Sequence, residues 1–353
     1  MKTILYPSSK LLHVDVHKLE TLSCLRKYFF MYVLNIIPRG FNMHFWYGAV
    51  LGEGVEVLLK TKDYKKALTA MKKKDKELLI NEILLPEQRE EINLQRKMIF
   101  IIVKVWAKVH KKYIDSVILD KSECRFQMQL EQSPVFFEGT LDGMGSLLGT
   151  STRVMFEIKT VASQYLNDDY FNLLLFDKQI NGYAIGKKKA ELIKFGLCHY
   201  LVFRKPSIRV RQNEDIEGFL ERLEHDLYER ADWYYIEYPH QFGVHAVEAV
   251  RRDIESLTFD LYCKYEFLNG EKMFDPFNWG RYSNQCFRYG RCKYFNLCKM
   301  VERYHLRLKG FKARELRYDL ELYELDKTHP ISSPSLRLNN KKRIISKTKK
   351  AKK

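Results

Sequence analysis

The pattern of apolar and polar residues divides the chain into helical and extended segments. Apolar residues recur every three or four positions in seven segments, which is typical of helices with one buried face. We predict helices over residues 17–37, 45–60, 64–82, 87–118, 168–187, 214–236 and 245–266. Apolar and polar residues alternate in five further segments, which predicts strands because successive side chains of a strand point to opposite faces. These strands cover residues 122–130, 135–142, 153–160, 197–203 and 207–211.

Helices before and after the strands predict an α/β or α+β fold, in which a mixed central sheet is flanked by helices. We expect an N-terminal helical region over residues 1–120, a core over 121–270 and a cysteine-rich segment with a C-terminal extension over 271–330. Residues 331–353 contain Ser, Asn, Arg and Lys without any acidic residue. This composition predicts a disordered basic tail.

Residues 137–160 combine two strand-like runs with a Gly/Ser/Thr-rich bend, which indicates a β-hairpin. Asp142 closes the first run. Glu157 and Lys159 stand two apart in the second, so their side chains point to the same side. If the hairpin forms, two carboxylates meet one ammonium. Such a set suits metal-assisted phosphodiester hydrolysis, because Mg²⁺ binds carboxylate oxygens and lowers the pKa of an attacking water. Any half-exposed antiparallel strand also shows this alternation, and that interpretation stays open.

A second pair of candidate residues lies in the helix predicted after the hairpin. Gln179 and Tyr183 are four residues apart and therefore share one face of a helix. Together they can hydrogen-bond a catalytic neighbour and stack on a base or sugar. The alternative is a partly buried amphipathic pair without a role in chemistry.

Three cysteines occur at equal spacing near the C-terminal end: Cys286, Cys292 and Cys298. Three thiols in so short a segment indicate a metal or cluster site. Zinc sites usually take cysteines in closely spaced pairs with a fourth ligand nearby, and no such ligand follows here. Cys24 is a distant candidate for the fourth ligand, and four thiolates suit a 4Fe–4S cluster. The other cysteines are interpreted as ordinary buried side chains. These are Cys124, Cys198 and Cys263.

The overall composition narrows the partners of the chain. It has 353 residues, of which 46% are hydrophobic, so a sizeable core is expected. A net charge of +17 indicates an anionic partner, nucleic acid before membrane, although part of this charge belongs to the tail. No apolar stretch is long enough for a membrane helix or a signal peptide, which favours a cytoplasmic protein. An odd number of cysteines fits a reducing compartment, and the missing phosphate-binding loop argues against an ATP-driven motor.

In this order, the hairpin, the Gln179–Tyr183 pair and the four cysteines resemble the PD-(D/E)XK nuclease superfamily. More narrowly, they resemble its RecB-like exonuclease branch with an iron–sulfur cluster, which includes CRISPR-associated and phage-encoded members. The resemblance spans roughly residues 20–300 and implies a restriction-endonuclease-like core over 121–270.

The resemblance also assigns roles to individual residues. It implies that Asp142, Glu157 and Lys159 are catalytic, and that Gln179 and Tyr183 support the site and the DNA. It further implies that the cluster is held by Cys24, Cys286, Cys292 and Cys298, which would attach the C-terminal segment to the N-terminal helix.

The helix predicted over residues 45–60 departs from the family pattern. The family usually reads Phe-Gly-Ser-Ala-x-His-Glu there, and the histidine is a metal ligand. This chain reads Tyr-Gly-Ala-Val-Leu-Gly-Glu, with Gly52 at the position of the histidine. Glu56 lies one turn on, about 40° round the helix from position 52, and is the substitute we consider. Glu53 lies farther round, at about 100°.

We therefore expect a Mg²⁺- or Mn²⁺-dependent DNA exonuclease or flap-type nuclease with a structural 4Fe–4S cluster. It would act on single-stranded DNA or on ends of double-stranded DNA, in recombination, repair or replication. Further copies of the chain, or other recombination and repair proteins, are additional candidate partners. The main alternative is a catalytically weakened DNA-binding protein that retains the fold, as the glycine at position 52 suggests. A zinc-stabilised structural module explains fewer of the motifs.

Overall fold

The computed structural model describes residues 12–130, 135–150, 153–189, 197–268, 270–287 and 291–314. The chain forms two compact units. One, here called the sheet unit, comprises Gly40–Met128 and Glu138–Ile254. The other, the cysteine unit, comprises Met1–Arg39, Gln129–Phe137 and Glu255–Lys353. The boundary predicted at residue 120 falls inside the sheet unit, because the helices between residues 43 and 109 pack on the sheet. The boundary predicted at residue 270 falls inside the cysteine unit. The predicted basic tail lies outside the described residues.

The sheet unit is built on a mixed sheet, which confirms the predicted α/β class. Its strands are β3 (Val117–Gln129), β4 (Val135–Leu147), β5 (Arg153–Ala162), β6 (Leu197–Lys205) and β7 (Tyr235–Gln241). The order is β4-β5-β6-β7, with β3 beside β4. β5 and β6 are parallel, whereas β4 is antiparallel to β5 and β7 is antiparallel to β6.

Within the sheet unit, the strand predictions were wrong at two places. Residues 207–211 form no strand, because Pro206 cannot donate a ladder hydrogen bond and the following residues are mostly exposed. β7 was not predicted as a strand, and the predicted helix 214–236 overlaps its first two residues. That helix is in fact divided into α9 (Ile216–Glu229) and α10 (Ala231–Tyr234), and the chain then enters the sheet.

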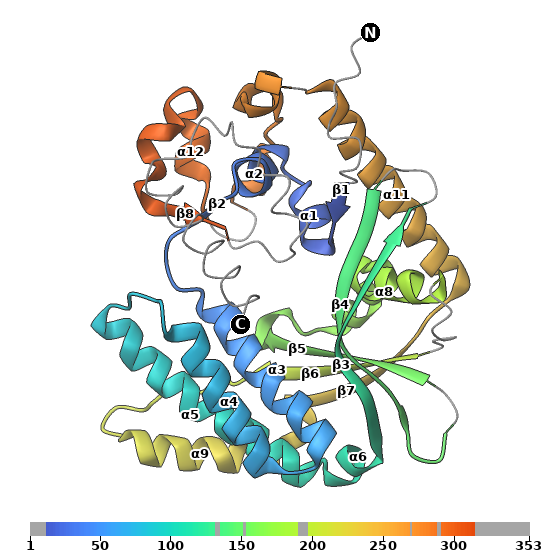
Figure 1. The fold of residues 1–353 in the computed structure, drawn as a ribbon. Coiled ribbons are helices and arrows are strands. Elements are labelled where there is room, and N and C mark those ends of the chain that lie inside the picture. Colours follow the sequence, from blue (N-terminus) through green and yellow to red (C-terminus); the bar gives the residue numbers. More distant parts are fainter. Residues whose placement is uncertain are drawn as a thin grey trace, which may run out of the picture. The chain divides into compact units, whose positions relative to one another are not determined.

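Four helices lie along one face of the sheet and enclose its core (Figure 1). They are α3 (Met43–Thr61), α4 (Tyr64–Leu79), α5 (Pro86–Val109) and α9. The core joins Trp46 of α3 and Trp106 of α5 to Phe156 and Phe203 of the sheet. The helix predicted over 87–118 is interrupted at His110, followed by α6 (Lys111–Ser116), and then gives way to β3.

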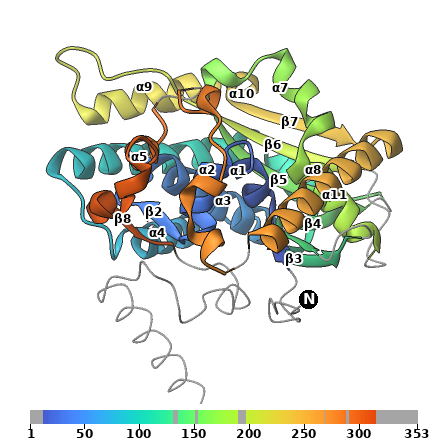
Figure 2. The same ribbon diagram turned by 90° about the horizontal axis from the view of Figure 1, so that it is seen from above.

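The segment between β5 and β6 is also interrupted where one helix was predicted. It contains α7 (Asp168–Asn172), a 3-10 turn (Leu173–Phe176) and α8 (Lys178–Lys189). Asp177 separates the last two. Its carboxylate accepts a hydrogen bond from the Ile180 backbone nitrogen at 2.8 Å, which caps the start of α8. In the view from above, α10 lies beside β6 and β7 (Figure 2).

The cysteine unit consists of short elements. These are β1 (Leu12–Val14), α1 (Val16–Thr21), α2 (Leu25–Tyr28), a π-helical turn (Phe29–Val33), β2 (Ile36–Pro38), 3-10 turns (Gly270–Phe274, Pro276–Asn278, Ser283–Gln285 and Val301–Gly310), α12 (Phe295–Lys299) and β8 (Phe311–Ala313). The boundary between the units falls within α11 (Val244–Phe267).

The single helix predicted over residues 17–37 was wrong. Cys24 has extended backbone angles between α1 and α2, and Ile36–Pro38 pair with β8. Buried aromatic rings surround this segment, with Phe30 stacked on Tyr294 and Tyr28 stacked on Trp279. Within the described ranges, no helix is both long and apolar enough to cross a bilayer.

Candidate active site and thiol site

The register of β4 and β5 positions the first candidate residues. Gly143 pairs with Phe156, and one further step of this antiparallel register sets Asp142 beside Glu157. The Ile158 backbone nitrogen donates a hydrogen bond to Asp142 Oδ2 at 2.8 Å, which holds the aspartate against the neighbouring strand. The predicted hairpin is confirmed, and it brings the two carboxylates together.

A chain of contacts connects the remaining predicted residues. Lys159 Nζ lies 2.5 Å from Glu157 Oε1 and donates a hydrogen bond to Gln179 Oε1 at 2.9 Å. Gln179 Nε2 in turn donates to Tyr183 Oη at 2.8 Å. Strand β5 supplies the first two residues, and one face of α8 supplies the other two. Of the Gln179–Tyr183 pair, Gln179 therefore contacts Lys159 directly, and Tyr183 contacts Gln179.

Burial sets the charge balance of this site. Only 3% of the Glu157 side chain is exposed, and among the described residues its oxygens have no partner other than Lys159. Burial raises the pKa of Glu157 to about 8, and repulsion from Asp142 adds to this while Lys159 opposes it. Burial likewise raises the pKa of Asp142, against the pull of Lys159 and of the Ile158 N–H.

The pKa of Lys159 is set by the opposite balance of burial and charge. Burial lowers the pKa of its ammonium, but attraction to Glu157 and Asp142 outweighs this, so the pKa of Lys159 is raised. The Lys159 side chain remains 31% exposed. Asp142 and Glu157 thus both face the Lys159 ammonium, and the raised pKa of Glu157 favours a proton on that carboxyl when no further cation is bound.

Tyr183 rests against a glycine of β4. A Cβ at Gly139 would lie 2.8 Å from Cε1 of Tyr183 and 2.8 Å from Cε1 of Phe126, closer than real side chains pack. The rings of Tyr183 and Phe126 meet edge to face at 5.6 Å. A glycine at position 139 therefore allows Tyr183 to approach the strand and hold Gln179.

Sequence reasoning missed two acidic residues near the site. Asp177 affects the pKa values of Glu157 and Lys159, and Glu123 of β3 raises that of Asp142. An aspartate before a helical run is a signal for a helix start, so Asp177 was detectable as a cap. Glu123, at a backbone φ of 46°, has no comparable signal in the sequence.

Glu56 and Gly52 lie on α3 as expected. Burial raises the pKa of Glu56, whereas a hydrogen bond with Ser122 lowers it. Repulsion from Glu53, Glu123 and Asp142 raises the pKa further. Glu56 thus shares an acidic environment with Asp142, and it also lines a pocket of about 240 Å³ with Glu53 and Glu123. A Cβ at position 52 would meet no atom within 4 Å, so the helix leaves room there for a side chain.

The four predicted cluster cysteines all belong to the cysteine unit. Backbone contacts hold their segments, since Cys292 N donates to Cys286 O at 2.8 Å and Cys298 N donates to Tyr294 O at 2.9 Å. Cys24 precedes α2. Two residues later, Arg26 N donates to Gly280 O at 2.8 Å and Arg26 Nε donates to Trp279 O at 2.7 Å.

The electrostatics of these thiols show that they share one neighbourhood. Burial raises the pKa of Cys298 to about 12; Arg26 lowers it, while Cys24, Cys292 and Cys286 raise it. Burial also raises the pKa of Cys286, and Cys24 and Cys292 add to that rise. The four thiols therefore lie near one another, with Arg26 and Arg281 close by.

The other cysteines were predicted to be buried, and this was wrong for one of them. Cys124 and Cys198 are buried, whereas Cys263 is exposed on α11. The helical pattern around Cys263 did not reveal which face is solvent-exposed.

Across the described ranges, no three His, Cys, Asp or Glu side chains are arranged to hold a single metal ion.

No family model matches the sequence, and no curated protein is significantly similar to it. The functional assignment therefore depends on the residues of this chain.

Proposed function

We propose that this protein is a metal-dependent DNA exonuclease that hydrolyses phosphodiester bonds and carries a structural 4Fe–4S cluster. The observation that supports this most directly is the convergence of Asp142, Glu157 and Lys159 at adjacent strands, with Gln179 and Tyr183 behind the lysine. Buried groups of this kind with strongly perturbed pKa values are typical of functional sites.

The carboxylates of the sheet unit are the type of donor that a hard divalent cation takes. Asp142 and Glu157 would hold Mg²⁺ or Mn²⁺, with Glu56, whose pKa Asp142 raises, as a third carboxylate. A cation bound there would neutralise phosphate charge and lower the pKa of the attacking water. It would also oppose the repulsion from Asp142 that contributes to the raised pKa of Glu157.

The residues of the chain have separate tasks in this proposal. Lys159 is held between Glu157 and Gln179, so its ammonium is oriented before a phosphate arrives. Its exposed part donates to the phosphate oxygen that gains charge in the transition state. Gln179 positions Lys159, and Tyr183 positions Gln179.

The thiols of the cysteine unit fit a cluster in their chemistry. A single Zn²⁺ would require thiolate sulfurs about 2.3 Å from the ion. A 4Fe–4S cluster instead takes one thiolate at each iron and is larger, and Cys24, Cys286, Cys292 and Cys298 supply the four thiols. A bound cluster would connect segments from the two ends of the described chain, and so couple its binding to folding.

The charge of the chain favours DNA as the substrate. The net charge of +17 supports binding to a phosphate backbone, and such binding is largely independent of sequence and sensitive to salt. The basic residues of 337–353 would contribute to this non-specific attraction.

Cleavage of end-labelled DNA tests the proposal. Protein purified without oxygen is incubated with single-stranded and double-stranded substrates, with and without Mn²⁺, beside a Lys159→Ala control. We expect metal-dependent shortening from an end by the wild type only. Binding without cleavage above the control would instead support the catalytically weakened DNA-binding protein, for which the glycine at position 52 argues.

A further inference from the structure

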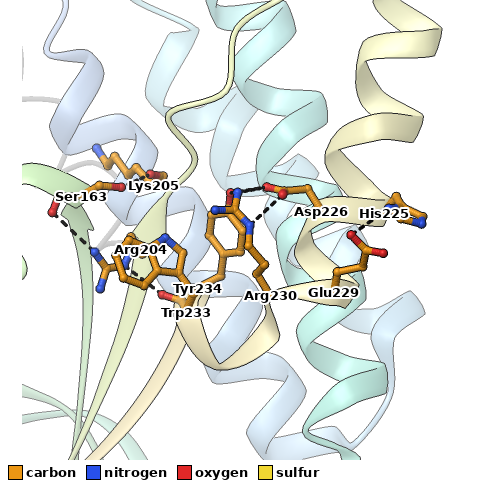
Figure 3. Close-up of polar contacts among 9 residues, drawn as sticks. All are labelled: Ser163, Arg204, Lys205, His225, Asp226, Glu229, Arg230, Trp233 and Tyr234. Atoms are coloured by element: carbon orange, nitrogen blue, oxygen red, sulfur yellow. Dashed lines mark hydrogen bonds and ion pairs between the residues drawn. The ribbon is translucent and has the colours of Figure 1, made fainter.

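Arg204 of β6 is a buried cation whose hydrogen bonds go to backbone carbonyls. Its side chain is 6% exposed, and its guanidinium carbon lies 3.6 Å from the ring centroid of Trp233 (Figure 3). Nε donates to Trp233 O at 2.9 Å, and Nη1 donates a long hydrogen bond to Ser163 O at 3.5 Å. No carboxylate among the described residues pairs with it, although buried arginines are seldom found without one.

Arg230, which lies immediately before α10, provides a contrast. It makes two hydrogen bonds to Asp226, at 2.7 Å and 2.5 Å, so its charge is neutralised (Figure 3). The guanidinium of Arg204 instead retains N–H donors beyond the two that bond to backbone carbonyls within the described ranges. A planar donor of this kind matches a phosphate group.

Trp233 differs from every other tryptophan of the chain. It is 49% exposed, whereas Trp46, Trp106 and Trp279 are at most 1% exposed. An indole with one face against a guanidinium and much of its surface in solvent is suited to stacking on an unpaired base. Tyr165, which is 59% exposed, follows Ser163 by two residues and adds a second exposed ring to this segment.

The register of the sheet relates this pair to the candidate active site. In the parallel pairing of β5 with β6, Lys159 is opposite Val202 and Val161 is opposite Arg204. Because side chains alternate along a strand, Arg204 lies on the same face of the sheet as Lys159, two residues farther on. That offset is about 7 Å along the strands, which one extended nucleotide can bridge.

We propose that Arg204 and Trp233 form a subsite for one unpaired nucleotide of single-stranded DNA, next to the phosphate that is cleaved. Arg204 binds the phosphate and Trp233 stacks on the base. This proposal rests on the proposed nuclease function for its position beside the scissile phosphate. It adds a preference for an unpaired strand, because a base in a duplex is not free to stack on the indole.

Tryptophan fluorescence tests the subsite without any cleavage. The full chain is titrated with a short oligothymidylate in buffer that contains EDTA, and binding is followed in parallel by anisotropy of a labelled oligonucleotide. We expect quenching of the exposed indole on binding. Trp233→Phe should keep affinity within about threefold and abolish the quenching, whereas Trp233→Ala should weaken binding roughly 5- to 150-fold.

Two arginine variants with the same charge change separate a phosphate contact from a structural role. Arg204→Gln should flatten the dependence of log affinity on log salt by about 0.7, the value for one contact to a single strand. Arg230→Gln, whose arginine is already paired with Asp226, should leave the slope unchanged. Thermal unfolding of both variants verifies that they are folded.

Several results would overturn the subsite: no binding of the oligothymidylate, binding without quenching, full affinity of Trp233→Ala, or equal slopes for the two arginine variants. Because the titration contains no metal, its outcome is independent of cleavage. Quenching together with an inactive enzyme in the Mn²⁺ assay would retain the subsite and reject the nuclease. Cleavage without quenching would do the opposite.

Discussion

The candidate active site and the four-thiol site differ in how far apart their residues lie in the chain. Asp142 and Glu157 come from neighbouring strands of one hairpin, so strand register alone sets them side by side. Cys24 and Cys298 come from opposite ends of the described residues. They meet only when those ends have folded together. In both sites several potential anions lie beside basic side chains, Lys159 in the first and Arg26 and Arg281 in the second.

The candidate active site therefore depends on a sheet that folds without it, whereas we expect the fold of the cysteine unit to depend on its thiol site. The hairpin is part of a sheet with a large apolar core, so removal of one active-site side chain leaves most of the packing intact. The cysteine unit consists of short elements, and a cluster that joins them would couple its binding to their folding. Substitutions should therefore reduce chemistry in the first case and stability in the second.

The largest effect is expected for Lys159→Ala in the cleavage assay. A charged donor to a developing oxyanion contributes about 10²–10³ in rate, so most activity should be lost while DNA affinity is largely kept. Asp142→Asn should lose activity by another route, through a weaker cation site, and excess Mn²⁺ should restore part of it. Recovery of Lys159→Ala by added metal would contradict the role given to the lysine.

Cysteine variants should show the contrasting loss of stability. Cys24→Ala and Cys292→Ala should lose the iron and brown colour of anaerobic protein and lower Tm by about 5–10 °C, equivalent to roughly 2–3 kcal/mol. Cys263→Ala is the matched control, because this cysteine is exposed in the same unit and outside the four. Stoichiometric zinc without iron would exclude the cluster.

A substitution at Gly52 tests whether this position of α3 faces the proposed cation of the active site. Gly52→His places an imidazole where no atom lies within 4 Å of the new Cβ, and imidazole favours transition metals such as Mn²⁺ over Mg²⁺. We expect half-maximal activity at several-fold lower Mn²⁺. Gly52→Ala is the control, because replacing a glycine within a helix should raise the free energy of unfolding by up to about 1 kcal/mol in both variants. An equal metal response of the two would mean that position 52 does not face the cation.

The smallest effect concerns the pH dependence of the sheet unit. Burial lowers the pKa of His199 below its ordinary 6.5, while Glu237, which is paired with His110, opposes this. The unfolded chain therefore binds a proton more readily, so stability is complete above about pH 6.5 and falls as the pH drops below it. Tm measured between pH 5 and 8 should decline less for His199→Phe than for the wild type. The exposed His225→Phe should behave as the wild type.

Patterns confined to one segment determined much of the candidate site. The alternation around Asp142, Glu157 and Lys159 predicted both the hairpin and the shared face, since strand geometry acts over two residues. The spacing of Gln179 and Tyr183 placed them on one helix face for the same local reason. These predictions required no knowledge of distant contacts.

Features that depend on partners distant in the sequence could be seen only in the folded structure. The helix predicted over 17–37 breaks because Ile36–Pro38 pair with β8, and β7 exists because β6 offers a free edge. The same is true of Arg204, whose neighbour Trp233 and acceptor Ser163 lie outside its own strand. Local pattern fixes which way a side chain points within its element, whereas burial and electrostatic neighbours are fixed only when the elements pack together.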